Sequence, residues 1–218
     1  MSGFATTLIR NQVLYFSSVH FREPTLTHRA MTTAGWIAMT SAFASIPVAY
    51  LSYRLEGRID PAAAIIQSAI QIAGILIFLA ITLFLKKLLN NRFSFHDADM
   101  SIDWMIKANV VAGVLTLIAL NSSQLKETLG MAALLVMVAQ GVVQIRFGYR
   151  MLRLKNDLGG MLKPFCYANM ATGICLASIV LILVGVLISA ISDLMLGTIF
   201  FHMARSVKEQ ERKEAPDE

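Results

Sequence analysis

The chain has 218 residues, of which 56% are hydrophobic and 15% are charged, whereas an average soluble domain has about 25% charged residues. The mean hydropathy is +0.62. The net charge of +5 does not indicate nucleic-acid binding, because Lys and Arg stand at the ends of apolar segments and not in a patch with interleaved aromatic residues. The composition therefore excludes a soluble globular domain and predicts an integral membrane protein with the lipid bilayer as its surroundings.

Residues 1–29 carry Arg10 and Arg22 but no acidic residue before Glu23, and residues 13–16 form a short apolar cluster. That cluster is too short for the apolar region of a secretory signal peptide. We expect an N-terminal interfacial segment that lies on the membrane. The alternative is a mitochondrial presequence, which is also rich in Arg, Ser and Thr and poor in acids.

Four apolar segments follow, and each is long enough for a membrane-spanning helix. They cover residues 30–53, 61–85, about 104–120 and about 128–149. Pro47 should kink the first of them near its far end, and Pro61 suits the first turn of the second. Lys86 and Lys87 mark the interface at the end of the second segment, and the longest loop covers residues 88–103.

The last apolar region, residues 163–205, contains 29 consecutive residues without Asp, Glu, Lys or Arg, from Pro164 to Ser192. We expect two helices here, with a turn at Ser189 to Asp193 next to the first charged residue. Ser192 precedes Arg205 by 13 residues, or roughly 20 Å of helix, so this turn should stop below the far surface of a core about 30 Å thick. Asp193 is then a candidate ion, proton or anchoring site, and the plainer alternative is that it caps the last helix.

The sequence predicts an all-α membrane protein with about six transmembrane helices arranged as three quasi-repeated helical hairpins. The transmembrane domain covers residues 30–205, with hairpins at 30–87, 104–153 and 163–205, and residues 206–218 form a charged tail. The repeat is suggested by Asn109 followed by Gly113 in the second hairpin and Asn169 followed by Gly173 in the third, at the same spacing.

With six spans, 16 of the 19 basic residues fall on the side that holds both termini. Basic residues near span ends are retained in the cytoplasm. We therefore expect a multi-pass protein of the cell inner membrane with both termini cytoplasmic. The alternative is the mitochondrial inner membrane.

The loop with His96, Asp97, Asp99 and Asp103 is the densest set of potential metal ligands. No second His or Cys stands at ligand spacing, so we expect no metal there and expect Asp97 or Asp99 to cap the next helix. Only His202 lies in a predicted span, and a haem site is not expected. The sequence has no catalytic motif, so we expect neither an enzyme nor a bound cofactor.

The candidate site is a set of polar residues inside the predicted spans. Its members are Asp193, Gln67, Gln71, Gln140, Gln144, Asn109 and Asn169. Amide side chains in a membrane can join helices by hydrogen bonds of about 0.6 to 2 kcal/mol, or they can line a polar pathway.

Two functions follow from these alternatives. The first is an accessory or scaffold subunit that packs against copies of itself or other membrane subunits through small residues such as Gly130, Gly141 and Gly148. The second is a small transporter or channel with a polar site near Asp193, Gln67 and Gln71. Convergence of the polar residues on a water-accessible cavity favours transport, whereas dispersal between packed helices favours the subunit.

Overall fold

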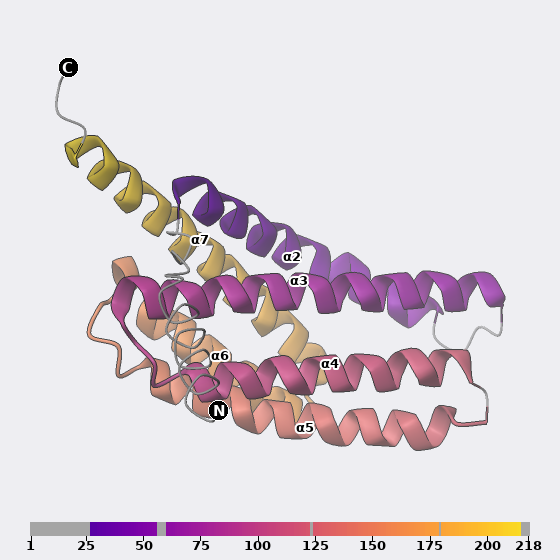
Figure 1. The fold of residues 1–218 in the computed structure, drawn as a ribbon. Helices are drawn as coiled ribbons and strands as arrows, with labels where there is room; N and C mark the ends of the chain where they lie inside the picture. Colours follow the sequence, from indigo (N-terminus) through magenta and orange to yellow (C-terminus); the bar gives the residue numbers. More distant parts are fainter. Residues whose placement is uncertain (1–26, 56–59, 123, 179, 215–218) are drawn as a thin grey trace, which may run out of the picture.

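The computed structural model describes residues 27–55, 60–122, 124–178 and 180–214. These residues form six α-helices and one short 3-10 helix (Figure 1). The elements are α2 (His28–Leu55), α3 (Pro61–Phe93), α4 (Asp99–Asn121), α5 (Lys126–Met151), η1 (Leu158–Gly160), α6 (Leu162–Ala177) and α7 (Ile182–Glu214). Each of the four apolar segments predicted between residues 30 and 149 lies within one of these helices.

The six helices form a closed ring in chain order. Each helix packs against the helices before and after it, and α7 returns to pack against α2. In the described parts of the chain, no two helices pack backbone against backbone across the ring, and the Arg92 side chain of α3 reaches Ser206 of α7 at the basic end. The helix boundaries at 93–99 and 151–162 lie at the same end as the start of α2 and the end of α7 (Figure 1). We call this the basic end, and we call the end with the α2–α3 and α4–α5 connections the opposite end.

The outer surface of the ring is apolar. Side chains such as Phe43, Leu183 and Ile65 are 70% or more exposed, which is the arrangement expected when lipid and not water surrounds the helices. Five helices, α2, α3, α4, α5 and the Ile182–Glu209 part of α7, are long and apolar enough to cross a membrane. The protein is therefore an all-α membrane protein, as the composition predicts.

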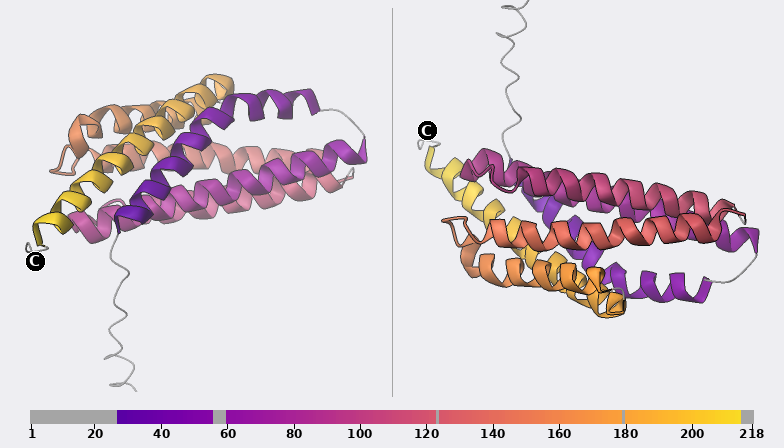
Figure 2. Two further views of the ribbon diagram at one scale, coloured as in Figure 1. Left: turned by 90° about the horizontal axis from the view of Figure 1, so that it is seen from above. Right: turned by 90° about the horizontal axis from the view of Figure 1, so that it is seen from below.

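Local sequence explains where α3 begins and ends. Asp60 stands at the N-cap and accepts a hydrogen bond from the Ala62 N–H at 3.2 Å, with Pro61 at the first helical position. Ser94 adopts a left-handed conformation (φ 48°) and ends the helix. The helix thus continues past Lys86 and Lys87, and the loop predicted at residues 88–103 is shorter than expected, because α4 begins at Asp99. Helix α2 contains Pro47 and bends part-way along its length (Figure 2).

The prediction of a turn at Ser189 to Asp193 is wrong. Helix α7 is continuous from Ile182 to Glu214, so Asp193 lies inside it and caps no helix. The connection between α6 and α7 lies around Ser178, where the Ser178 hydroxyl donates to the Cys175 carbonyl (2.9 Å) and accepts from the Leu181 N–H (3.4 Å). These bonds satisfy backbone groups that lipid cannot.

The α6–α7 hairpin is nevertheless shorter than its neighbours. Helix α6 has 16 residues, or roughly 24 Å, against a hydrocarbon core of about 30 Å. In both views of Figure 2 its turn ends short of the α2–α3 and α4–α5 connections. Because α6 is too short to count as a span by length, the count of six transmembrane helices stays a prediction.

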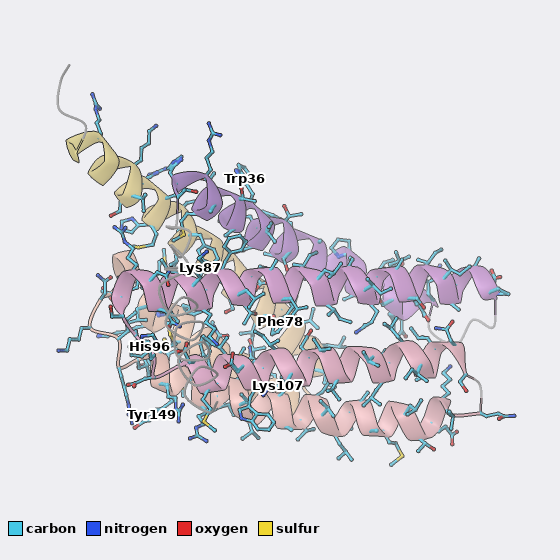
Figure 3. All side chains as sticks on the ribbon, in the orientation of Figure 1. Trp36, Phe78, Lys87, His96, Lys107 and Tyr149 are labelled. Atoms are coloured by element: carbon cyan, nitrogen blue, oxygen red, sulfur yellow. The ribbon has the colours of Figure 1, made fainter. Side chains whose placement is uncertain are left out.

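The well-packed core lies at the basic end. The largest fully buried side chains in the described residues come from the helix segments that meet there. They are Met31, Leu88, Leu89, Ile102, Phe147, Met151, Leu158, Cys166, Ile199 and Phe200. Lys87, His96 and Tyr149 lie toward the same end (Figure 3). At the opposite end, the buried side chains are mostly alanines, such as Ala63, Ala119 and Ala133.

The charged tail and the N-terminal segment are described only in part. Helix α7 continues through the predicted tail as far as Glu214. Of the predicted interfacial segment, only residues 27–29 are described, and the rest lies outside the described residues.

Candidate functional site

A cavity of about 470 Å³ lies inside the helix ring, and all six helices contribute to its wall. Its polar side chains come from every helix. They are Ser41 and Ser45 of α2, Gln71 and Thr82 of α3, Asn109 of α4, Gln144 of α5, Asn169 of α6, and Ser189, Ser192 and Asp193 of α7. A ring of helices whose backbones do not pack across its centre has room for such a cavity. The ring thus has polar groups inside and apolar groups outside.

Asp193 is the single ionisable side chain among the described residues that line the cavity. It projects from the middle of α7 and is half-buried. The Ser41 hydroxyl of α2 donates a hydrogen bond to Asp193 Oδ2 at 2.9 Å, which ties the two helices that close the ring. Neither ion pair found in the described residues involves Asp193. The carboxylate therefore has a neutral hydrogen-bond donor but no basic partner from the described protein.

Asn169 of α6 joins three helices beside the cavity. Its Nδ2 donates to Ser192 Oγ of α7 at 2.8 Å and to the Phe165 carbonyl at 3.0 Å. Its Oδ1 accepts from Gln144 Nε2 of α5 at 3.3 Å. The side chain is buried and both of its polar atoms have partners. Asn169 and Gln144 therefore hold α5, α6 and α7 together by hydrogen bonds, and both residues also line the cavity.

Asn109 of α4 is arranged differently from Asn169. Its Oδ1 atom is buried and has no hydrogen-bond partner in the described part of the chain. An unpaired buried acceptor costs about 1 to 3 kcal/mol. Asn109 is one of the residues that line the cavity, but its Oδ1 atom has almost no exposed surface there.

The remaining wall is apolar and partly aromatic. Phe78 of α3, Phe147 of α5 and Phe165 of α6 line the cavity, and Phe78 extends from α3 toward the inside of the ring (Figure 3). Phe147 and Phe165 meet edge to face, with ring centroids 6.4 Å apart at 88°. A cavity with both polar and apolar residues in its wall can hold a molecule that has both a polar group and an apolar body.

Five of the seven candidate residues from the sequence line this cavity: Asp193, Gln71, Gln144, Asn109 and Asn169. Gln67 and Gln140 do not. Each lies one helical turn from its cavity-lining neighbour, toward the opposite end of the ring, and both side chains are half-buried. Whether the five have a role in function stays a prediction.

Sequence reasoning missed the hydroxyl groups. Ser189, Ser192, Asp193 and Leu196 all line the cavity and follow a helical spacing along one face of α7. Ser41 and Ser45 of α2 lie one turn apart in the same way. The pattern on α7 was not recognised because a turn was predicted at Ser189 to Asp193.

The His96 loop forms a polar network outside the cavity. His96 Nδ1 lies 3.0 Å from Asp99 Oδ2, and Asn90 Nδ2 donates to the same oxygen at 3.2 Å. The N-cap of α4 is Ala98, without a side-chain cap bond, so the predicted capping by Asp97 or Asp99 is wrong. Within the described residues, no group of three or more His, Cys, Asp or Glu is placed to hold a metal ion.

Comparison with known proteins adds no assignment. No protein-family model, no curated protein and no solved structure matches the chain. Any account of function therefore depends on the cavity and on the packing of the helices around it.

Proposed function

We propose that the protein is a small membrane transporter or channel whose solute path includes the cavity lined by Asp193. The observation that supports it most strongly is the convergence of five intramembrane polar residues on one cavity of about 470 Å³ inside a ring of six helices. Intramembrane polar residues that line a cavity are typical of solute paths, and Asn169 and Gln144 combine this position with hydrogen bonds between helices.

The packing of glycines favours this proposal over an accessory or scaffold subunit. A Cβ atom on Gly141 would lie 2.6 Å from the Gly173 carbonyl oxygen, and one on Gly148 would lie 2.8 Å from the Cys166 carbonyl oxygen. Both glycines thus serve the close approach of α5 to α6 within the chain. They belong, with Gly130, to the small residues through which contact with other subunits was expected. The fold itself requires Gly141 and Gly148, whereas a Cβ on Gly130 would meet nothing within 4 Å.

The hairpin repeat and the orientation belong to the same proposal. Asn109 and Asn169 stand on α4 and α6, which both begin at the basic end, and both side chains line the cavity. Gly113 and Gly173, four residues further on, each lie against the preceding helix. These parallels support three related hairpins that cross the cell inner membrane six times, with the basic end and both termini cytoplasmic. The mitochondrial inner membrane stays the alternative.

The packing also supports a cavity that is closed at the basic end in this conformation. Large side chains such as Leu89, Met151 and Phe200 fill the ring at the basic end, whereas small residues predominate among those buried at the opposite end. A solute would then enter from the opposite end, and passage would require the basic end to open.

Cysteine accessibility from both sides of the membrane tests the proposal. Ser189→Cys is placed in the cavity wall after Cys166→Ala and Cys175→Ala remove the native thiols. A small, membrane-impermeant methanethiosulfonate reagent is applied to intact cells and to inverted vesicles. Leu187→Cys, on the same helix and 50% exposed on the ring exterior, is the matched control.

The proposal predicts that Ser189→Cys is modified from both sides and that Leu187→Cys is modified from neither. Modification of Ser189→Cys from one side only, or from neither side, would contradict a path through the membrane. Size-exclusion chromatography of both variants checks that each is folded.

A further inference from the structure

The chemistry of the cavity also identifies the class of solute. We propose that it binds an organic monocation, a molecule with one ammonium group and an apolar, aromatic body. This inference rests on the proposed function, because it names what occupies the same cavity.

The charge of the wall points to a cation. Asp193 is a carboxylate inside a membrane helix, and no Lys or Arg is among the described residues that line the cavity. Charged groups at such depth pair with an opposite charge or are neutralised, because an isolated charge in a medium of low polarity is costly. The Ser41 hydroxyl contributes one hydrogen bond at 2.9 Å but no charge. An ammonium group would supply both the charge and further donors, whereas an anion would be repelled.

The arrangement does not suit a bare metal ion. Hard cations such as Ca²⁺ take six to eight oxygen ligands, several of them from carboxylates. Asp193 is the one carboxylate in the described cavity wall, and its nearest identified partner, Ser41, uses its hydroxyl as a donor toward it. The neighbouring amides Gln144 and Asn169 are engaged with each other. A single carboxylate therefore falls short of the several that such an ion takes.

The size and the walls of the cavity suit an organic body. Ligand pockets in proteins typically have about 300 to 1,000 Å³, and the cavity has about 470 Å³. Phe78 is half-buried and provides aromatic surface in the wall, which attracts cations through the ring quadrupole and also packs against apolar groups. One carboxylate, the half-buried ring of Phe78 and the apolar remainder of the wall together match an amine with an apolar body.

Four probes of matched size or charge test this inference by isothermal titration calorimetry on the full chain in lipid nanodiscs. They are phenethylammonium, the neutral 2-phenylethanol, the anion phenylacetate and sodium ion. The test variant is Asp193→Asn. The control is Asp60→Asn, an exposed position outside the cavity where Asn also serves as an N-cap.

We expect phenethylammonium to bind and the other three probes to bind at least tenfold more weakly. Asp193→Asn should weaken phenethylammonium binding at least tenfold, whereas Asp60→Asn should leave it unchanged. Equal binding of 2-phenylethanol, a preference for sodium, or full affinity in Asp193→Asn would overturn the inference. So would the absence of binding by all probes, which would mean that a proton neutralises Asp193 and that the cavity takes no such cation.

Different results would contradict the proposed path and the proposed class of solute. If Ser189→Cys is accessible from both sides but no organic cation binds, the path stands and the solute class is wrong. If phenethylammonium binds in an Asp193-dependent way but Ser189→Cys is closed to one side, the protein is a binding protein without a path.

Discussion

The basic end and the opposite end of the helix ring are built from the same helices but are packed in different ways. At the basic end, Leu88, Leu89 and Phe200 are fully buried, and Arg92 of α3 donates to Ser206 of α7 at 2.9 Å. At the opposite end, the apolar α6–α7 turn stops short of the other connections (Figure 2), and Val180 in it is 89% exposed. The difference indicates that the basic end holds the fold together and closes the cavity, while the opposite end can vary with little cost.

The largest expected effect is at the packed end. Phe200→Ala removes a side chain that is 0% exposed and should lower the free energy of unfolding by about 3 to 5 kcal/mol, since the core cannot collapse around the space. Ile191→Ala on the same helix removes a side chain that is 48% exposed on the ring exterior and should cost well under half as much. Thermal unfolding in detergent measures both. Equal losses would mean that the two regions do not differ.

A second contrast compares two glycines of α5. Gly148→Leu would place a Cβ 2.6 Å from Met170 Cγ and 2.8 Å from the Cys166 carbonyl oxygen, so α5 and α6 must separate at a cost of about 1 to 3 kcal/mol. Gly130→Leu stands near the opposite end, where a Cβ meets nothing within 4 Å. It should be neutral or slightly stabilising, because leucine favours helix more than glycine does. The melting temperatures of the two variants decide the matter. A stable Gly148→Leu protein would show that the tight α5–α6 contact is not needed.

The smallest effect concerns the Lys86–Asp103 ion pair, which joins α3 and α4 at the basic end with an N–O distance of 2.5 Å. Both side chains are partly exposed, at 27% and 47%, so Asp103→Asn should lower stability by less than about 1 kcal/mol. Adding salt should reduce the difference between the variant and the unmodified protein. A loss as large as that of Phe200→Ala would mean that charge, and not apolar packing, holds the basic end.

The sequence predicted the four helices before residue 151 because each carries a clear apolar segment bounded by polar residues. It erred where charge was taken as a boundary. A loop was predicted directly after Lys86 and Lys87, where α3 continues to Phe93, and Asp193 was predicted to lie in a turn. The real turn, around Ser178, lies inside a charge-free run, so neither charge nor length marks it in the sequence.

Residue type alone predicted several residues of the candidate site, but it did not predict which of the polar residues line the cavity. Polar residues inside apolar segments are costly in lipid, which is why Asp193, Asn109 and Asn169 stood out. Depth along the ring decided which of the paired glutamines face the cavity, and depth depends on how the helices pack. Sequence spacing alone could not separate Gln71 from Gln67 or Gln144 from Gln140.

The central claim is that the interior of the ring is wet and polar while its exterior faces lipid, and spin labels on α2 test it most directly. One label replaces Ser45, which lines the cavity, and the other replaces Phe43, which is 73% exposed on the exterior. Power saturation in liposomes compares collisions with a water-soluble nickel complex and with oxygen, which concentrates in lipid. We predict that the nickel complex relaxes the label at position 45 more strongly and that oxygen relaxes the label at position 43 more strongly. Oxygen dominance at both positions would mean that no water reaches the cavity and would contradict the account.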